Sequence, residues 1–235
     1  MNKLKKHRSF ILLLVIQCIF CFLCGMVKTG ATFDELLTYQ RASSMFADEA
    51  KYVSYEQQVD FYNRIHTNEE FMSNFAVKKG ETFFDQTFAK QIKTFIYQDT
   101  YMVLLNMAMS FGNGKFNTWY CIGINIVLFL LTQVCLYCLS EKVYHNQRYS
   151  LLAVGLYGFT VSAVKTVLFL RFYELFVLFV LLYMLLGMSM LNQSKVDWKF
   201  WGKLLLSFVL FYFGYANAEY MIFLAAAFSL SFVLI

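Results

Sequence analysis

The chain has 235 residues, of which 59% are hydrophobic, 20% aromatic and 15% charged, with a mean hydropathy of +0.52 and a formal net charge of +5. Soluble globular domains carry about 25% charged residues, so this composition excludes an ordinary soluble domain. The basic residues are spread over short segments between apolar runs, which excludes a nucleic-acid-binding face and makes membrane lipid the expected partner.

Six apolar segments predict an all-α integral membrane protein with about six transmembrane helices, because a helix needs about 20 apolar residues to cross a bilayer. The segments cover residues 9–27, 119–139, 150–166, 170–191, 204–217 and 219–235. The last segment stops within an apolar run, so we expect a fragment of a longer protein or a helix that ends flush with the membrane surface. The sequence contains no proline, and helix breaks are therefore expected at glycine and polar residues.

Three parts are expected along the chain. Residues 1–27 form a cytoplasmic tail and the first transmembrane helix, residues 28–118 form an extracytoplasmic loop, and residues 119–235 form a bundle of about five transmembrane helices that is truncated at its C-terminal end. This orientation follows from the excess of Lys and Arg on cytoplasmic flanks. The short flanks that share one side are marked by Lys3, Lys5, Lys6, Arg8, Lys142, Arg148, Lys195, Lys199 and Lys203. The predicted location is a cell membrane, specifically a bacterial plasma membrane.

The long loop has the composition of a folded segment rather than of a linker. Residues 28–100 carry eleven acidic and eight basic residues, with little glycine. Apolar residues recur at helical spacing over residues 59–75, which predicts short amphipathic helices at the membrane interface. The recurring residues are Phe61, Ile65, Phe71 and Phe75. Residues 95–111 predict a further apolar helix, interfacial or re-entrant, because Asp99 and Asn106 interrupt it.

The segment GATFDELLTYQRASS, residues 30–44, directly follows the first span and admits two interpretations. In the first, Thr32 is an N-cap and Glu35, three residues later, completes a capping box. In the second, Asp34 and Glu35 are catalytic carboxylates at a membrane surface, with Tyr39 one helical turn further on. The spacing alone leaves both open.

Ionisable residues of the later segments fall, in this topology, at the same membrane face as that segment. They are Asp99, Lys165, Arg171, Glu174 and Glu219. Charges at this depth are costly unless they are paired or functional. Cations there can bind a lipid phosphate, and a facing carboxylate can deprotonate an acceptor hydroxyl while that phosphate leaves. This chemistry is glycosyl transfer from a polyprenyl-phosphate sugar.

Each of these residues also has a purely structural interpretation. Arg171 and Glu174 are three residues apart, as in an intrahelical ion pair. Lys165 can snorkel to the interface. Asp99 can cap an interfacial helix, and Glu219 can be the solvated end of a span.

Three stretches, taken together, resemble the GT-C class of membrane glycosyltransferases, and within it the protein mannosyltransferase and aminoarabinose transferase-like family. Residues 30–44 resemble the first outer-loop signature of that family. Residues 156–185 resemble its third and fourth spans, with Arg171, Phe172 and Tyr173 opening the fourth. Residues 214–235 resemble its sixth span. The resemblance covers most of the chain in order and topology.

The resemblance implies that Asp34 is the catalytic base and Glu35 its partner, and that Arg171 and Lys165 bind the lipid phosphate. The further substrate-binding candidates are Tyr39, Asp99, Tyr173, Glu174 and Glu219. The implied donor is a lipid-linked sugar on polyprenyl phosphate, and the acceptor is a glycan, a lipid or a protein. No cofactor is assigned, and a need for a divalent metal stays open.

The chain departs from the family pattern at two places. Tyr101, Met102 and Val103 stand where the family has a His-Pro-Pro step, and Glu219 stands where the sixth span has a histidine. We therefore weigh a glycosyltransferase of the extracytoplasmic face against a catalytically inactive membrane subunit or scaffold in cell-envelope polysaccharide assembly. A transporter is a third hypothesis, which the placement of charges at one face disfavours.

Overall fold

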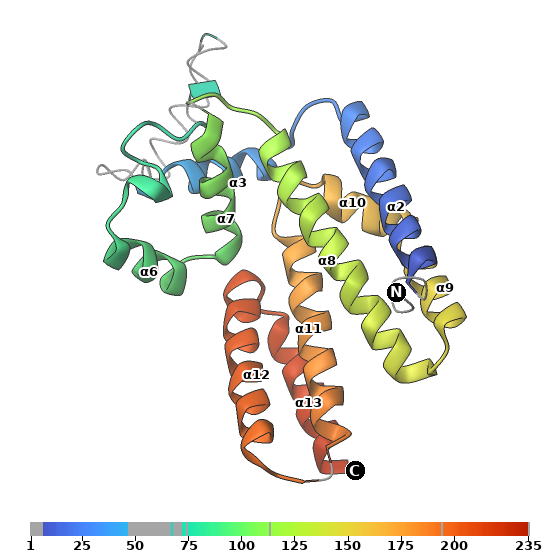
Figure 1. Ribbon diagram of the computed structural model, residues 1–235. Coiled ribbons are helices and arrows are strands. Elements are labelled where there is room, and N and C mark those ends of the chain that lie inside the picture. Colours follow the sequence, from blue (N-terminus) through green and yellow to red (C-terminus); the bar gives the residue numbers. More distant parts are fainter. Residues whose placement is uncertain are drawn as a thin grey trace. The chain divides into compact units, whose positions relative to one another are not determined.

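The computed structural model describes residues 7–46, 67, 72–73, 75–112, 114–193 and 195–234. Over these ranges the regular secondary structure is helical, with no strand (Figure 1). The chain forms two compact units, which we call the bundle unit and the inserted unit. The bundle unit consists of residues 1–28 and 125–235, and the inserted unit of residues 29–124.

Among the described residues, three helices are long and apolar enough to cross a membrane: α2 (Arg8–Val27), α8 (Trp119–Tyr144) and α11 (Tyr173–Leu191). A fourth crossing is formed if α9 (Gln147–Gly158) and α10 (Val161–Leu168) make one bent span. The prediction of an all-helical membrane protein is confirmed at this level. The described residues thus give three or four spans by length and composition, against about six expected from the sequence.

The predicted third span, residues 150–166, is divided in the structure. The axes of α9 and α10 differ by 58° across a short break. The break follows Gly158, and Thr160 then starts α10 by accepting a hydrogen bond on Oγ1 from the Ala163 amide at 3.1 Å. A capping threonine satisfies an amide that a new helix start would leave unpaired. Glycine and a polar residue thus make the break, as expected for a chain without proline.

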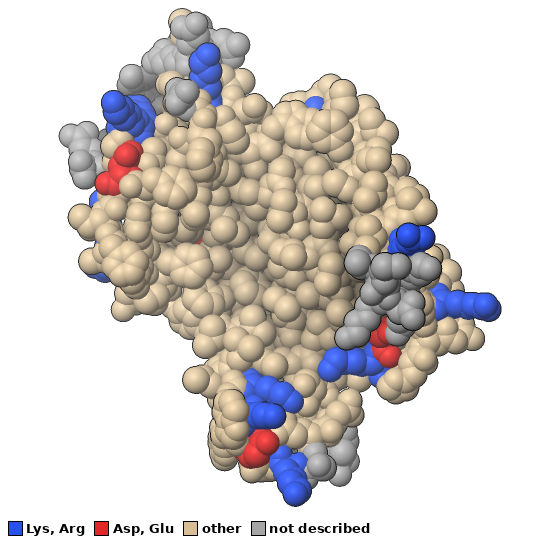
Figure 2. All heavy atoms as spheres, viewed as in Figure 1, with Lys and Arg blue, Asp and Glu red and all other residues tan. Residues whose placement is uncertain are grey.

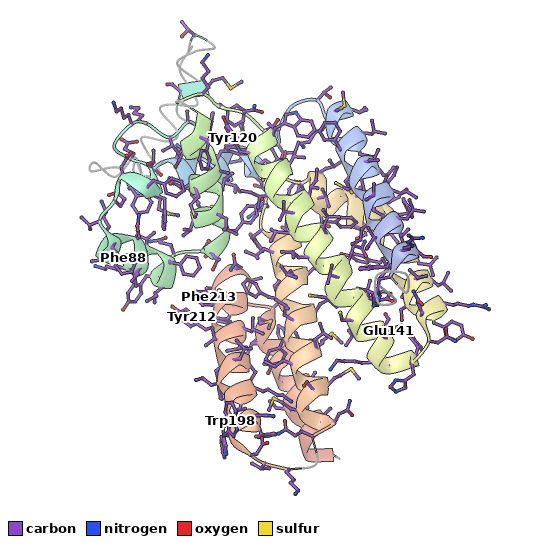
Figure 3. All side chains as sticks on the ribbon, in the orientation of Figure 1. Phe88, Tyr120, Glu141, Trp198, Tyr212 and Phe213 are labelled. Atoms are coloured by element: carbon purple, nitrogen blue, oxygen red, sulfur yellow. The ribbon has the colours of Figure 1, made fainter. Side chains whose placement is uncertain are left out.

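The C-terminal part of the bundle unit consists of α12 (Trp198–Asn217) and α13 (Met221–Leu234), which pack on α11 and on each other. α13 has 14 residues, about 21 Å of helix, against about 30 Å of bilayer core. Figure 3 shows Trp198 at the start of α12 and Tyr212 and Phe213 towards its other end. Aromatic side chains near both ends of a helix are typical of membrane interfaces.

Charged side chains of the bundle unit gather at helix ends. On the face shown in Figure 2, the middles of its helices are covered by uncharged side chains. Lys142 lies in the last turn of α8, Arg148 in the first turn of α9, and Lys199 in the first turn of α12. This distribution suits helices surrounded by lipid, because a charge in the hydrocarbon region is costly.

The inserted unit contains α3 (Phe33–Ser43), η1 (Phe83–Asp85), α6 (Phe88–Tyr97), α7 (Thr100–Met109) and η2 (Ser110–Gly112). The helices α3 and α7 pack together. Among the described residues of this unit, Tyr39, Phe75 and Tyr101 are fully buried aromatic side chains. These contacts give the unit an apolar core of its own.

Two expectations for this region have different outcomes. The helix expected over residues 59–75 lies mostly outside the described residues, although Phe75 is described and is fully buried. The single helix expected over residues 95–111 is divided at Gln98 and Asp99 into α6 and α7. The second polar residue of that segment, Asn106, is buried: its Nδ2 donates to the Ala42 carbonyl at 2.8 Å.

Candidate functional site

The two carboxylates at the start of α3, Asp34 and Glu35, differ in their exposure to solvent. Glu35 is fully buried, and its Oε2 accepts a hydrogen bond from the Thr32 amide at 2.6 Å. Thr32 Oγ1 in turn accepts from the Glu35 amide at 3.4 Å, which completes a capping box. Asp34 is exposed in the same turn. The capping interpretation is therefore confirmed for Thr32 and Glu35, and Asp34 is the member of the pair whose side chain is accessible.

Replacing Thr32 by Ala is expected to weaken the first turn of α3 by about 1 kcal/mol, the usual contribution of a Ser or Thr N-cap. Hydrogen exchange of the α3 amides in the detergent-solubilised chain would measure it as faster exchange in this turn. Thr29→Ala is the matched control, because Thr29 is exposed and precedes the helix. Equal protection in both variants would contradict a stabilising role for the capping box.

Tyr39 lies in the core of the inserted unit. Its hydroxyl is 3.0 Å from the carbonyl oxygens of Asn117 and Thr118, and it accepts a hydrogen bond from the Cys121 amide at 3.1 Å. Burial raises the pKa of the Tyr39 phenol above its ordinary value. This network ties α3 to the first turn of α8, which explains the presence of a tyrosine in the core.

Asp99 occupies the N-cap position of α7 but makes no side-chain capping bond. It lines a cavity of about 240 Å³ in the inserted unit together with Arg41 and Tyr97. Burial raises the pKa of the Asp99 carboxyl, and the Arg41 charge opposes that rise. Asp99 and Arg41 therefore act on each other inside this unit.

A cavity of the bundle unit lies between the end of α2, the helix α10 and the start of α11. It has a volume of about 630 Å³, and its wall includes Lys28 and Lys165. Val27, Leu168 and Phe169 contribute apolar surface. The cavity thus combines two cationic side chains with an apolar wall, which is the combination that a lipid phosphate requires. We call it the lysine pocket.

The connection that closes the lysine pocket is held by one buried side chain. Asn125 of α8 donates from Nδ2 to the carbonyl oxygens of Val167 and Phe169, both at 3.0 Å. These carbonyls end α10, so the bonds fix the turn that leads into α11. Arg171 lies in this turn, with its guanidinium 5.6 Å from the Phe172 ring and 5.7 Å from the Tyr173 ring. Such distances allow cation–π attraction.

Glu174 is the second residue of α11, directly after the pocket residue Tyr173, and is fully buried. Its Oε2 is 2.7 Å from Thr166 Oγ1, whereas its Oε1 has no hydrogen-bond partner among the described residues. Thr166 itself lines the lysine pocket. The ion pair that the Arg171–Glu174 spacing allowed is not formed among the described residues. The Thr166 hydroxyl is the hydrogen-bond partner of Glu174 in its place.

A second cavity of the bundle unit offers a useful contrast. It has a volume of about 400 Å³ between α11, α12 and α13, and includes Tyr183, Phe200, Phe208 and Ser229 in its wall. The described side chains that line it carry no charge. It can hold an apolar chain but offers nothing to neutralise a phosphate.

The predicted site residues are divided between the two units. Those of the inserted unit are Asp34, Glu35, Tyr39 and Asp99, and those of the bundle unit are Lys165, Arg171, Tyr173, Glu174 and Glu219. Lys165 and Tyr173 line the lysine pocket. Arg171 and Glu174 lie within two residues of Tyr173 in the sequence. Glu219 is exposed in the turn between α12 and α13.

Lys28 and Thr166 are among the residues of the lysine pocket that the sequence did not identify as site candidates. Lys28 directly follows the first predicted span and falls on the same predicted face as Lys165. That position is a signal that could have identified Lys28 as a site residue, although the sequence places it only at the start of the loop. Thr166 had no signal of its own, because a threonine in an apolar run is common in membrane helices. Both were found only when α2 and α10 were seen to pack together.

A metal-binding cluster or a known relative would each help to identify this site. Within the part of the chain that the structure describes, no three His, Cys, Asp or Glu side chains are grouped so as to hold a metal ion. Comparisons with known protein families, curated proteins and solved structures return no match. The features that bear on function are therefore the chemistry of the lysine pocket and that of the α3 segment.

Proposed function

We propose that the chain is a membrane glycosyltransferase that takes a sugar from a polyprenyl-phosphate-linked donor and transfers it to an envelope acceptor on the extracytoplasmic face. One observation supports this most: Lys28 and Lys165 line a pocket whose remaining wall is largely apolar. Lysine ammonium groups attract a phosphate as point charges, and the apolar wall suits an isoprenoid chain.

The proposed topology has six spans with a cytoplasmic N-terminus in a bacterial plasma membrane. In this arrangement, the end of α2 and the end of α10 lie at the same, extracytoplasmic face. The shared pocket of Lys28 and Lys165 supports this pairing, because residues at opposite membrane faces do not line one cavity. The basic residues at the other helix ends suit the cytoplasmic side.

The proposed reaction has three participants from the protein. Asp34 removes the proton from an acceptor hydroxyl, whose oxygen then attacks the anomeric carbon of the donor sugar. The bond between that carbon and the phosphate oxygen breaks, and the lipid phosphate leaves with the electron pair. Lys28 and Lys165 stabilise the negative charge on the leaving phosphate. Glu35 holds the first turn of α3, on which Asp34 lies.

Photo-crosslinking with a diazirine-bearing prenyl phosphate tests the lipid-phosphate site. The purified chain is irradiated with this probe in detergent, and the labelled peptides are identified by mass spectrometry. We expect labels on the end of α2 and on α10, reduced several-fold by Lys28→Gln with Lys165→Gln. The matching prenyl alcohol is the control. Equal labelling by the alcohol, or labels confined to the uncharged cavity of α11, α12 and α13, would contradict the proposal.

A further inference from the structure

The wall of the lysine pocket holds a hydrogen-bonded chain that the proposed reaction does not use. Thr166 Oγ1 is 2.7 Å from Glu174 Oε2 and 2.8 Å from the Ala163 carbonyl oxygen. A threonine hydroxyl has one hydrogen to donate, and a carbonyl oxygen can only accept. If Glu174 were ionised, its oxygen would also only accept, and one hydrogen would have to serve both short contacts.

A proton on Glu174 satisfies both contacts at once. Glu174 then donates from Oε2 to Thr166 Oγ1, and Thr166 donates its own hydrogen to the Ala163 carbonyl. Each of the two short contacts of Thr166 then has one hydrogen of its own. Thr132 Oγ1 and Glu174 Oε1 have no hydrogen-bond partner among the described residues.

The surroundings of Glu174 favour the same neutral state. The side chain is fully buried, and no cation pairs with it in the described parts of the bundle unit. The other ionisable groups that face it are the Cys21 thiol of α2 and the Tyr157 phenol of α9, neither of which can be a cation. Burying an unpaired carboxylate is costly, so such a group takes up a proton instead.

We infer that Glu174 is held protonated and acts as a hydrogen-bond donor to Thr166, so that the one hydrogen of the Thr166 hydroxyl, given to the Ala163 carbonyl in the free chain, can turn to a phosphate oxygen in the lysine pocket. The inference rests on the proposed function, because it needs a phosphate between Lys28 and Lys165. Thr166 is then a ligand-binding residue and Glu174 a positioning residue. A neutral Glu174 also leaves the positive charge of the two lysines undiminished for the phosphate.

Two threonine and two glutamate variants separate this role from simple packing. Thr166→Val keeps the shape and removes the hydroxyl, whereas Thr166→Ser keeps the hydroxyl. Glu174→Gln keeps a donor, because its amide N–H replaces the acid O–H, whereas Glu174→Leu removes it. We expect Val and Leu to weaken binding of farnesyl phosphate by about tenfold or more, and Ser and Gln to stay within a few-fold of the natural chain.

Binding is measured by titrating farnesyl phosphate into the purified full chain in detergent, with farnesol and inorganic phosphate as separate titrants. Binding of farnesyl phosphate alone identifies a lipid phosphate. Tight binding of inorganic phosphate would identify a free-phosphate site that uses the same donors. Circular dichroism and gel filtration verify that each variant is folded.

The infrared spectrum supplies a second readout that needs no ligand. At neutral pH the natural chain should show a carboxylic-acid C=O band that shifts in D₂O and is missing from the spectrum of Glu174→Gln, so that the difference spectrum of the two contains it. Absence of that band overturns the inference, as does weak binding by Glu174→Gln or full binding by Thr166→Val. If Lys28→Gln with Lys165→Gln leaves binding unchanged, the lysine pocket itself fails, and the proposed function fails with it.

Discussion

Replacing Asp34 by Asn is expected to lower the rate of sugar transfer at least about 100-fold, the smaller end of what a general base contributes. The amide keeps the size of the side chain but cannot accept the acceptor's proton. Asp34 is exposed in the first turn of α3, whereas its neighbour Glu35 is buried in the capping box. The substitution should therefore leave the helix and the amount of folded protein unchanged.

The control for this substitution is Glu141→Gln, which removes one carboxylate near the end of α8 (Figure 3). It changes the net charge of the chain by the same amount as Asp34→Asn. Transfer by Glu141→Gln should match that of the natural chain. Undiminished transfer by Asp34→Asn would exclude Asp34 as the base.

Replacing Gly158 by Ala is expected to destabilise the bundle unit by about 1–3 kcal/mol, the usual cost of overpacking a well-packed interior. A Cβ at this position would lie 2.5 Å from Gln17 Cδ and would also overlap the amide nitrogens of Gln17 and Gln133. Both glutamines are fully buried. Gln17 has little freedom to move, because its Nε2 donates to the Val154 carbonyl at 2.9 Å.

Gly155 provides the matched control within the same helix. A Cβ there would meet only Leu13 Cδ2, at an ordinary contact distance of 3.9 Å. Gly155→Ala should be neutral or slightly stabilising, because alanine is the better helix former. Thermal unfolding in detergent compares the two. If the unfolding temperature of Gly158→Ala equals that of Gly155→Ala, the helices α2, α8 and α9 have room for a Cβ at position 158, which contradicts this prediction.

Features that depend on local sequence were predicted well. The apolar runs located α2, α8 and α11, because a spanning helix is defined by its own composition. The capping box of Thr32 and Glu35 could be identified as one of two interpretations, because both partners lie within three residues. What the local sequence could not decide was whether Glu35 had a second role in the reaction.

Features that depend on distant contacts could not be predicted. The residues on both sides of the break after Gly158 are apolar enough to predict one continuous span, and the two glutamines that approach this glycine come from α2 and α8. Tyr39 binds backbone groups of residues 117–121, about 80 positions along the chain. The lysine pocket likewise joins residues of α2 and α10. Such contacts are set by packing, which single-sequence periodicity does not encode.

The most direct test of the account is sugar transfer by the purified natural chain in proteoliposomes. The donor is a polyprenyl-phosphate sugar with a label in the sugar, and envelope extract supplies the acceptors. We expect labelled acceptor to appear together with an equal amount of free polyprenyl phosphate, and neither to appear with Asp34→Asn. If the natural full-length gene product binds the lipid phosphate but releases none from the donor, the chain is a non-catalytic membrane subunit and the proposed activity is wrong.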